Sequence, residues 1–222
     1  MKIYTVSNSK GGCCKSTTST ALATMLNEKG RKVLLIDADP QGNSTDTYRA
    51  ETNGVATLYD VILDSDPLPM NEVIQHTDRG DIVTSDKLLG DADKILSGDV
   101  SGMYRMADAL SELKGYDYVI IDTAPALNIL LFNCLIASDG VMIPVTTDRY
   151  SLQGLSQLNT SIREIQRSIF VKRRSVLQTA TQILAQLWLK HRKDWQGITS
   201  MTDFLRNGIQ LWVCQRQLFT AT

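Results

Sequence analysis

Short runs of apolar residues predict four strands that are covered on both faces. They occupy residues 2–7, 33–36, 118–122 and 140–146. Such short, β-branched runs are typical of strands in a parallel sheet with helices on both sides. A fifth run, at residues 81–84, predicts one more strand.

The segments between these strands show the periodicity of helices. In residues 15–29, for example, Ala21, Leu22, Met25 and Leu26 lie on one helical face. The other predicted helices cover residues 57–63, 71–76, 86–96, 101–113, 127–138 and 151–167. Strands that alternate with helices pair in parallel through right-handed crossovers. The sequence therefore predicts an α/β protein with a doubly wound, mostly parallel sheet flanked by helices.

Unusual polar segments lie at the ends of three predicted strands. Residues 9–17 follow the first strand, residues 37–43 follow the second, and residues 122–125 end the strand at 118–122. In doubly wound sheets, ligands bind at the carboxyl ends of the strands. We therefore expect these three segments to meet around one ligand.

The composition narrows the class of protein only slightly. Hydrophobic residues make up 43% of the 222 residues, as in ordinary globular proteins, and a net charge of −1 gives no overall attraction to nucleic acid. The sequence shows no secretory signal and no run of eighteen apolar residues. Its four cysteines show no Cys-x-x-Cys spacing. We expect a soluble cytoplasmic protein with reduced thiols.

The segment between the first strand and the first helix has the composition of a phosphate-binding loop. Its glycines let backbone amides approach phosphate oxygens, and the N-terminus of the helix adds a favourable dipole. Lys15 would reach the β- and γ-phosphates, and the Ser16 hydroxyl would coordinate Mg²⁺. The predicted nucleotide-binding residues are Lys10, Gly11, Gly12, Cys13, Cys14, Lys15, Ser16 and Thr17. An ordinary glycine-rich turn is the alternative, but Lys-Ser-Thr at the helix start favours phosphate.

Residues 10–17, in the order Lys-Gly-Gly-x-x-Lys-Ser-Thr, resemble the deviant Walker A motif of the ParA/MinD family of partition and positioning ATPases. The resemblance extends from residue 1 to about residue 167 and implies the P-loop NTPase fold, with ATP and Mg²⁺ as ligands. The family's signature is an additional lysine at the start of the loop, here Lys10. In relatives this lysine crosses a dimer interface to the partner's nucleotide, so the resemblance implies a homodimer with ATP between its copies.

Two further segments resemble the same family. Residues 37–43 are similar to its switch I segment, in which Asp39 matches the residue that positions the attacking water and Asp37 one near the magnesium ion. Residues 122–125 are similar to the Walker B and switch II segment, in which Asp122 holds Mg²⁺ through water. The resemblance thus implies catalytic roles for Lys10, Lys15 and Asp39, and metal-binding roles for Ser16, Asp37 and Asp122. Any one of these aspartates, taken alone, would also fit a capping residue at a strand end.

Two positions depart from the family pattern. Cys14 stands where the family has the glycine before the lysine, and Ala124 replaces the first of two prolines. That glycine is expected to adopt backbone angles that cost a residue with a side chain ~1–3 kcal/mol. We therefore expect weakened nucleotide binding. A reactive thiol at the helix N-terminus is the less favoured alternative.

Residues 170–222 differ in character from the rest of the chain. All three tryptophans fall in this stretch, and its valines and isoleucines are never adjacent, so no buried strand is predicted. The family continues here with a further strand and with helices that supply part of the adenine pocket. We therefore expect a P-loop ATPase domain at 1–169 and an atypical, poorly packed C-terminal segment at 170–222. A rearranged or frameshifted end is our hypothesis for the origin of this segment.

Surface patterns suggest partners less strongly. The candidate for non-specific DNA binding is one dense basic cluster, made of Arg163, Arg167, Lys172, Arg173 and Arg174. A solvated helix end with cations favoured by the dipole would explain this cluster equally well. Residues 204–212 have apolar residues at helical spacing, but Gly208 and a scarcity of cations disfavour a membrane-surface helix.

The leading hypothesis is a ParA-like ATPase that acts in plasmid or chromosome partitioning. It would bind ATP and Mg²⁺, dimerise, bind DNA without sequence preference, and release it when a ParB-like partner stimulates hydrolysis. The alternatives are a degenerate nucleotide-binding protein without turnover and a MinD-like positioning ATPase. A metal-chaperone ATPase of the same superfamily is disfavoured because no Cys-x-x-Cys pair is present.

Overall fold

A seven-stranded sheet forms the centre of the computed structural model, which describes residues 1–96, 101–146 and 209–215. Its strands are β1 (Lys2–Val6), β2 (Val33–Ala38), β3 (Ile74–Thr77), β4 (Gly80–Val83), β5 (Tyr118–Thr123), β6 (Gly140–Thr146) and β7 (Ile209–Gln215). They follow the order β3-β4-β2-β5-β1-β6-β7 across the sheet. Every neighbouring pair is parallel except β3 with β4 and β6 with β7. The predicted mostly parallel sheet is therefore confirmed.

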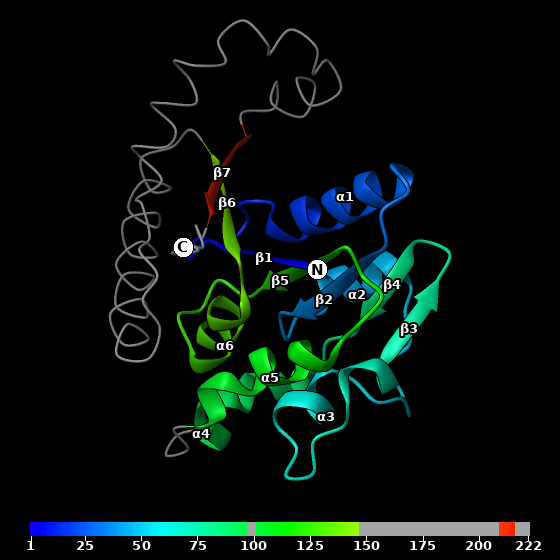
Figure 1. Ribbon diagram of the computed structural model, residues 1–222. Helices are drawn as coiled ribbons and strands as arrows, with labels where there is room; N and C mark the ends of the chain where they lie inside the picture. The colour runs from blue at the N-terminus through cyan, green and yellow to red at the C-terminus, as the bar shows by residue number, and fades with distance from the viewer. Residues whose placement is uncertain (97–100, 147–208, 216–222) are drawn as a thin grey trace, which may run out of the picture.

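Helices cover both faces of this sheet (Figure 1). The α-helices are α1 (Lys15–Glu28), α2 (Asn43–Tyr48), α3 (Leu58–Ile62), α4 (Ala92–Leu96), α5 (Arg105–Glu112) and α6 (Ile129–Ala137). Short 3₁₀ helices are η1 (Met70–Glu72), η2 (Lys87–Asp91) and η3 (Ser101–Tyr104). Helices α1 and α2 pack on one face, and α3, α5 and α6 pack on the other.

Two hydrophobic cores result, one on each face, and β2 contributes to both. Leu34 and Ile36 belong to the larger core, whereas Val33 and Leu35 belong to the smaller one. Successive side chains of a strand point to opposite faces, so a strand buried on both sides must be apolar at every position. This requirement explains why the continuous apolar runs predicted the central strands correctly.

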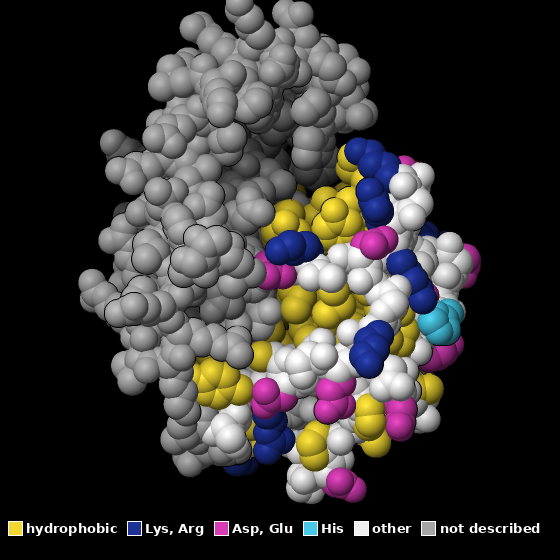
Figure 2. Space-filling view, viewed as in Figure 1, with side chains coloured by type: hydrophobic (Ala, Val, Ile, Leu, Met, Phe, Trp, Pro, Cys, Tyr) yellow, Lys and Arg dark blue, Asp and Glu magenta, His cyan; other side chains and the backbone are white. Residues whose placement is uncertain are grey.

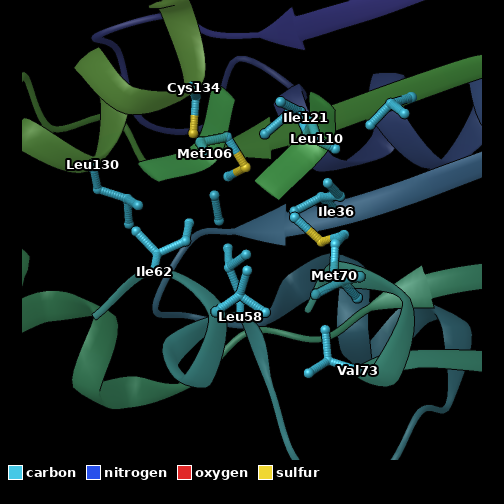
Figure 3. Packing of buried hydrophobic residues seen from close by; sticks show 14 of the residues in the cluster. Ile36, Leu58, Ile62, Met70, Val73, Met106, Leu110, Ile121, Leu130 and Cys134 are labelled. Atoms are coloured by element: carbon cyan, nitrogen blue, oxygen red, sulfur yellow. The ribbon is translucent and has the colours of Figure 1, made fainter. Parts of the chain in front are cut away.

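The larger core holds the helices α3, α5 and α6 against the sheet. Figure 3 shows Leu58, Leu110 and Leu130 from these helices around Ile36 and Ile121 of the sheet. Each of these five side chains is at most 2% exposed. Full burial of a side chain of this size contributes roughly 1.5–3 kcal/mol, so this layer stabilises the packing of the three helices on one face of the sheet.

Two short elements differ from the sequence prediction. The predicted helix at residues 71–76 is wrong, because η1 ends at Glu72 and β3 then forms a hairpin with β4, with Ile74 opposite Val83. Helix α2 begins at Asn43, the last residue of the polar segment 37–43, where the sequence predicted no helix. Both elements are too short for hydrophobic periodicity to distinguish helix from strand or loop.

The C-terminal segment also differs where it is described. No buried strand is predicted beyond residue 170, but residues 209–215 form β7, antiparallel to β6, with Trp212 opposite Ile143. Part of the apolar segment at 204–212 is therefore strand and not helix. The predicted helix at 151–167 and the basic cluster at 163–174 lie outside the described residues.

Charged side chains of both signs are interspersed over the described part of the face in Figure 2. This mixture agrees with the near-neutral charge of the sequence. Within the described ranges, no helix has the length and hydrophobicity needed to cross a bilayer.

Candidate functional site

The loop between β1 and α1 is anchored to the sheet by Asn8. The side-chain nitrogen of Asn8 donates to the carbonyl oxygen of Pro144 at 2.7 Å, and its side-chain oxygen accepts from the Lys10 amide at 3.0 Å. The amide of Ser7 donates to the carbonyl of Met142 at 3.0 Å. Asn8 is fully buried, so these bonds fix the point at which the loop leaves the sheet.

The loop then passes through two residues in the left-handed backbone region. Gly12 has φ 70°, and Cys14 has φ 60° and ψ 35°. This conformation costs a non-glycine residue roughly 1–2 kcal/mol. A Cβ built at Gly11 or Gly12 would meet no atom within 4 Å, so these glycines border open space. The structure bears out the expectation that position 14 needs backbone angles natural to glycine.

Helix α1 begins at Lys15, and the side chain of Cys14 makes no capping hydrogen bond. Lys15 is only 7% exposed, and its Nζ donates to the carbonyl oxygen of Lys10 at 3.3 Å. The buried Cys13 thiol donates to the same carbonyl at 3.1 Å. The loop therefore closes on itself around an ammonium group. The Lys15 ammonium can change its hydrogen-bond acceptor from the Lys10 carbonyl oxygen to phosphate oxygens without leaving the loop.

Three predicted aspartates lie beside this loop, at the carboxyl ends of β2 and β5. The register places Asp37 opposite Asp122, and it places Val6, the last residue of β1, opposite Asp122 on the other side. Asp37 and Asp122 are 0% exposed and Asp39 is 6% exposed. The strand order thus brings the predicted loop and the predicted carboxylates to one edge of the sheet.

Hydroxyl groups from two helices hold the carboxylate of Asp122. Ser19 of α1 donates to Oδ1 at 3.1 Å, and Ser44 of α2 donates to Oδ2 at 2.7 Å. Ser16, at the start of α1, is a further hydrogen-bond partner of this carboxylate. A single buried side chain therefore joins α1, α2 and β5.

Asp37 and Asp39 are held by the turn that follows β2. The amide and the hydroxyl of Thr45 donate to Oδ2 of Asp37 at 2.8 and 2.9 Å, and the amide of Asp39 donates to Oδ1 at 3.1 Å. The carboxylate of Asp39 accepts from the Gln41 amide at 3.0 Å. Its backbone carbonyl accepts from the Gly42 amide at 2.9 Å and from the Ser85 hydroxyl at 2.5 Å.

Burial raises the pKa of Asp37 to about 7, and repulsion by Asp122 adds to this rise. Hydrogen bonds from Thr45 and Asp39 act in the opposite direction. Burial also raises the pKa of Asp122, although hydrogen bonds from three serines favour its charged form. Two neighbouring buried carboxylates are stable as charges only with a nearby cation, so this edge of the sheet favours a positively charged ligand.

The residues at this edge fit a magnesium ion. The carboxylates of Asp37 and Asp122 and the hydroxyl of Ser16 are hard oxygen donors. Mg²⁺ in nucleotide sites is held by one or two such groups together with phosphate oxygens and water. The donor set, placed next to an amide-rich loop with a buried lysine, therefore suits a magnesium nucleotide.

Sequence reasoning missed several residues that build this site. Ser19, Ser44, Thr45 and Ser85 are at most 3% exposed, and each donates a hydroxyl or an amide hydrogen to an aspartate or to its neighbour in the network. Serine and threonine are common throughout the chain, so their type alone gives no signal. The positions of Ser19 in α1, of Ser44 and Thr45 in α2, and of Ser85 after β4 become informative only when the strand order is known.

These features define a P-loop nucleoside triphosphatase. They are a central parallel strand, a glycine-containing loop, a helix that starts with lysine, and an aspartate on the neighbouring strand. A family profile described as an AAA domain matches residues 1–176. The chain belongs to this family.

Known proteins narrow the assignment further. The chain is 38% identical to the sporulation initiation inhibitor protein Soj of Bacillus subtilis over 172 residues, which are 76% of this chain and 67% of Soj. It is 36% identical to the chromosome partitioning protein ParA of Caulobacter vibrioides over 173 residues, which are 76% of this chain and 65% of that protein. The match thus spans about two thirds of the length of these relatives. The chain is a member of the ParA/MinD family of P-loop ATPases.

A solved structure supports the fold assignment. Cobyrinic acid a,c-diamide synthase from Mycobacterium smegmatis, with bound ADP and magnesium, superposes with a TM-score of 0.70 at 30% identity. The similarity covers 75% of this chain and 69% of the synthase. The same architecture therefore holds a magnesium nucleotide in that enzyme.

Proposed function

We propose that this chain is a ParA-like ATPase that acts in plasmid or chromosome partitioning. It binds ATP with Mg²⁺ at the loop between β1 and α1 and dimerises around the nucleotide. The observation that carries this proposal is the convergence of the buried Lys15, Asp37, Asp39 and Asp122 at one edge of the sheet. The similarity to Soj and ParA supports the cellular role.

Charge neutralisation is the task of the two lysines. Lys15 moves its hydrogen bond from the Lys10 carbonyl to the β- and γ-phosphate oxygens. Lys10 of each copy reaches the nucleotide of the other copy, as the deviant Walker A pattern implies. The loop amides from Gly11 to Thr17 bind the remaining phosphate oxygens.

Ser16, Asp37 and Asp122 would hold the magnesium ion, Asp122 through a water molecule. When bound, this ion neutralises the charge that develops on the phosphate oxygens. Asp122 keeps its position because Ser19 and Ser44 donate to its two oxygens, so it is already oriented before the ligand arrives.

Asp39 orients the attacking water. Its carboxylate lies one residue beyond the end of β2, and the Gln41 amide fixes one of its oxygens at 3.0 Å. Phosphoryl transfer depends mainly on positioning and on charge neutralisation, so a weak base such as a carboxylate is sufficient.

DNA and an activator complete the proposed cycle. The cluster formed by Arg163, Arg167, Lys172, Arg173 and Arg174 binds DNA phosphates without reading the sequence. A ParB-like protein then stimulates hydrolysis and releases the dimer. In this cycle the protein works in the cytoplasm, on the nucleoid.

A nucleotide-binding protein without turnover is the second candidate, and Cys14 is the observation that favours it. Its left-handed backbone at φ 60° places a side chain where the family has glycine. The side chain stands at the entrance of α1, where a phosphate would approach the helix.

ATP binding and phosphate release, measured for the natural chain and for Cys14→Gly, test these candidates. Turnover in the natural chain that Lys15→Ala abolishes supports an active ATPase. Turnover in Cys14→Gly alone supports the degenerate protein. Failure of both chains to bind ATP with Mg²⁺ would contradict both candidates.

The partitioning role needs a separate measurement. We expect ATP-dependent binding to DNA of arbitrary sequence, with an affinity that falls steeply as salt concentration rises. Vesicles with anionic lipids serve as the comparison. Binding to vesicles without binding to DNA would favour a MinD-like positioning ATPase.

A further inference from the structure

We propose that Ser85 is a positioning residue that holds the switch I segment, residues 37–43, in the arrangement that ATP hydrolysis requires. The residue follows β4 directly after Thr84 and is 3% exposed. This inference rests on the proposed function, because it acts through the water-orienting role of Asp39.

Ser85 binds both ends of the turn that follows β2. Its hydroxyl donates to the carbonyl oxygen of Asp39 at 2.5 Å, and its amide donates to the hydroxyl oxygen of Thr45 at 3.0 Å. Asp39 begins this turn, and Thr45 lies in the first turn of α2. One residue next to the sheet therefore contacts both ends of a turn of seven residues, from Asp39 to Thr45.

The bond to Thr45 also sets the direction of a hydrogen-bond chain. Because the Thr45 hydroxyl oxygen accepts from the Ser85 amide, its own hydrogen is directed to Oδ2 of Asp37 at 2.9 Å. Hydrogen bonds in such a chain polarise and strengthen one another. Ser85 therefore supports both the magnesium-site aspartate and the water-orienting aspartate.

The bond to Asp39 fixes the plane of the peptide that follows this aspartate. The carbonyl oxygen has two donors, the Ser85 hydroxyl and the Gly42 amide at 2.9 Å. Of these two, only Ser85 lies outside the turn. Without its hydroxyl, the carbonyl keeps only the Gly42 amide, which moves with the turn itself, and the carbonyl side of Asp39 loses its bond to the residues after β4.

Space next to the turn makes this link important. A surface hollow of about 350 Å³ is lined by Gln41, Gly42, Thr45 and Ser85, among other residues. Side chains do not fill this volume, so packing leaves the turn room to shift. Hydrogen bonds therefore hold the turn: those of Ser44 and Thr45 to the aspartates tie its far end to β5 and β2, and those of Ser85 tie both of its ends to the residues after β4.

Hydrogen exchange of the nucleotide-free protein tests the link directly. In Ser85→Ala, we expect the Gln41 and Gly42 amides to exchange about 5–10 times faster, the factor that corresponds to one net hydrogen bond. Ser138→Ala is the matched control. It also removes a buried hydroxyl, one that donates to the Cys134 carbonyl at 2.7 Å. Unchanged exchange in Ser85→Ala would overturn the proposal.

Steady-state kinetics test the consequence for hydrolysis. In the Cys14→Gly chain, Ser85→Ala should lower kcat about tenfold and leave KM for ATP within about twofold, because positioning is lost while the phosphate loop is intact. Ser85→Thr, which keeps the hydroxyl, should recover most of kcat. An unchanged kcat, or a parallel loss of ATP binding, would overturn the positioning role. Absence of turnover in the parent chain would count against the proposed function, and hydrogen exchange would still decide whether Ser85 holds switch I.

Discussion

Cys14 precedes the first residue of α1, and its left-handed backbone favours glycine over alanine, whereas the interior of a helix favours alanine. At φ 60°, alanine is as strained as cysteine, whereas glycine is not. We expect Cys14→Gly to exceed Cys14→Ala in stability by about 1 kcal/mol, after the entropy cost of glycine in the unfolded chain is subtracted. Chemical denaturation of the two variants measures this difference.

Met25, a half-exposed residue in the interior of α1, provides the comparison for this prediction. We expect the Met25→Ala protein to be more stable than the Met25→Gly protein by about 1 kcal/mol, as at interior positions of ordinary helices. If the alanine variant is the more stable one at position 14 as well as at position 25, position 14 is not strained.

Asp37 should make the stability of the nucleotide-free protein depend on pH. Its pKa is raised to about 7 by burial and by Asp122, so the folded state binds a proton that the unfolded state releases near pH 4. The stability contributed by the protonated form is therefore lost as pH rises from about 4 to about 7. The loss is at most about 4 kcal/mol, the limit set by a shift of roughly three pKa units.

The difference in unfolding free energy between the natural chain and Asp37→Asn isolates this effect. It should change with pH over this window and become constant above it. Addition of Mg²⁺ and ATP should flatten the profile of the natural chain, because a bound cation favours the ionised carboxylate. A difference that stays constant from pH 4 to pH 8 would contradict the assignment.

Among the secondary-structure elements, α5 and α6 are joined by a single polar residue in the core. Asn133 is 0% exposed, its side-chain nitrogen donates to the Gly102 carbonyl at 2.8 Å, and its oxygen accepts from the Met106 amide at 3.2 Å. Asn133→Leu removes both bonds and leaves two buried backbone groups without them, at a cost of about 2–4 kcal/mol. Asn71→Leu, on the exposed surface of η1, should change the stability little. Thermal unfolding of both variants provides the test, and equal losses would contradict it.

The sequence predicted the elements that are buried on both faces and failed on those that are not. Strands β2 and β5 are apolar at nearly every position because both faces are covered, and this pattern has no other common explanation. Strand β3 is four residues long, is only partly buried, and exists because it pairs with β4. Pairing of this kind depends on tertiary contacts that no local pattern records.

The site was predictable as far as its residue types are distinctive. Lys15, Asp37 and Asp122 form motifs with known spacing, and the strained angle at Cys14 followed from the motif that it interrupts. The hydroxyl groups that hold these residues belong to common residue types. Ser85 lies 46 residues after Asp39, whose carbonyl it binds, so only the fold reveals the connection.

On the scale of the whole molecule, β7 covers the backbone hydrogen-bonding groups of β6 at one edge of the sheet. It pairs with β6 along its full length, from Gly140 opposite Gln215 to Thr146 opposite Ile209. A chain shortened to residues 1–169 would leave β6 as an edge strand, with the apolar residues Val141, Met142 and Ile143 next to unpaired backbone groups. We expect such a chain to self-associate.

A chain shortened to residues 1–215, which keeps β7, is the matched control for this prediction. Light scattering and size-exclusion chromatography at equal concentration would compare the two. If both chains behave as the natural one does, β7 contributes nothing to the protection of the edge.

The strained residue at the entrance of α1 has a consequence for the history of the gene. Codons for cysteine and glycine differ by a single base, so the natural chain is one mutational step away from the unstrained loop. If cells depend on hydrolysis by this protein, revertants with glycine at position 14 should rise quickly under selection for stable inheritance of a replicon. If such a population retains cysteine over many generations, relief of the strain at position 14 gives no advantage in the inheritance of the replicon.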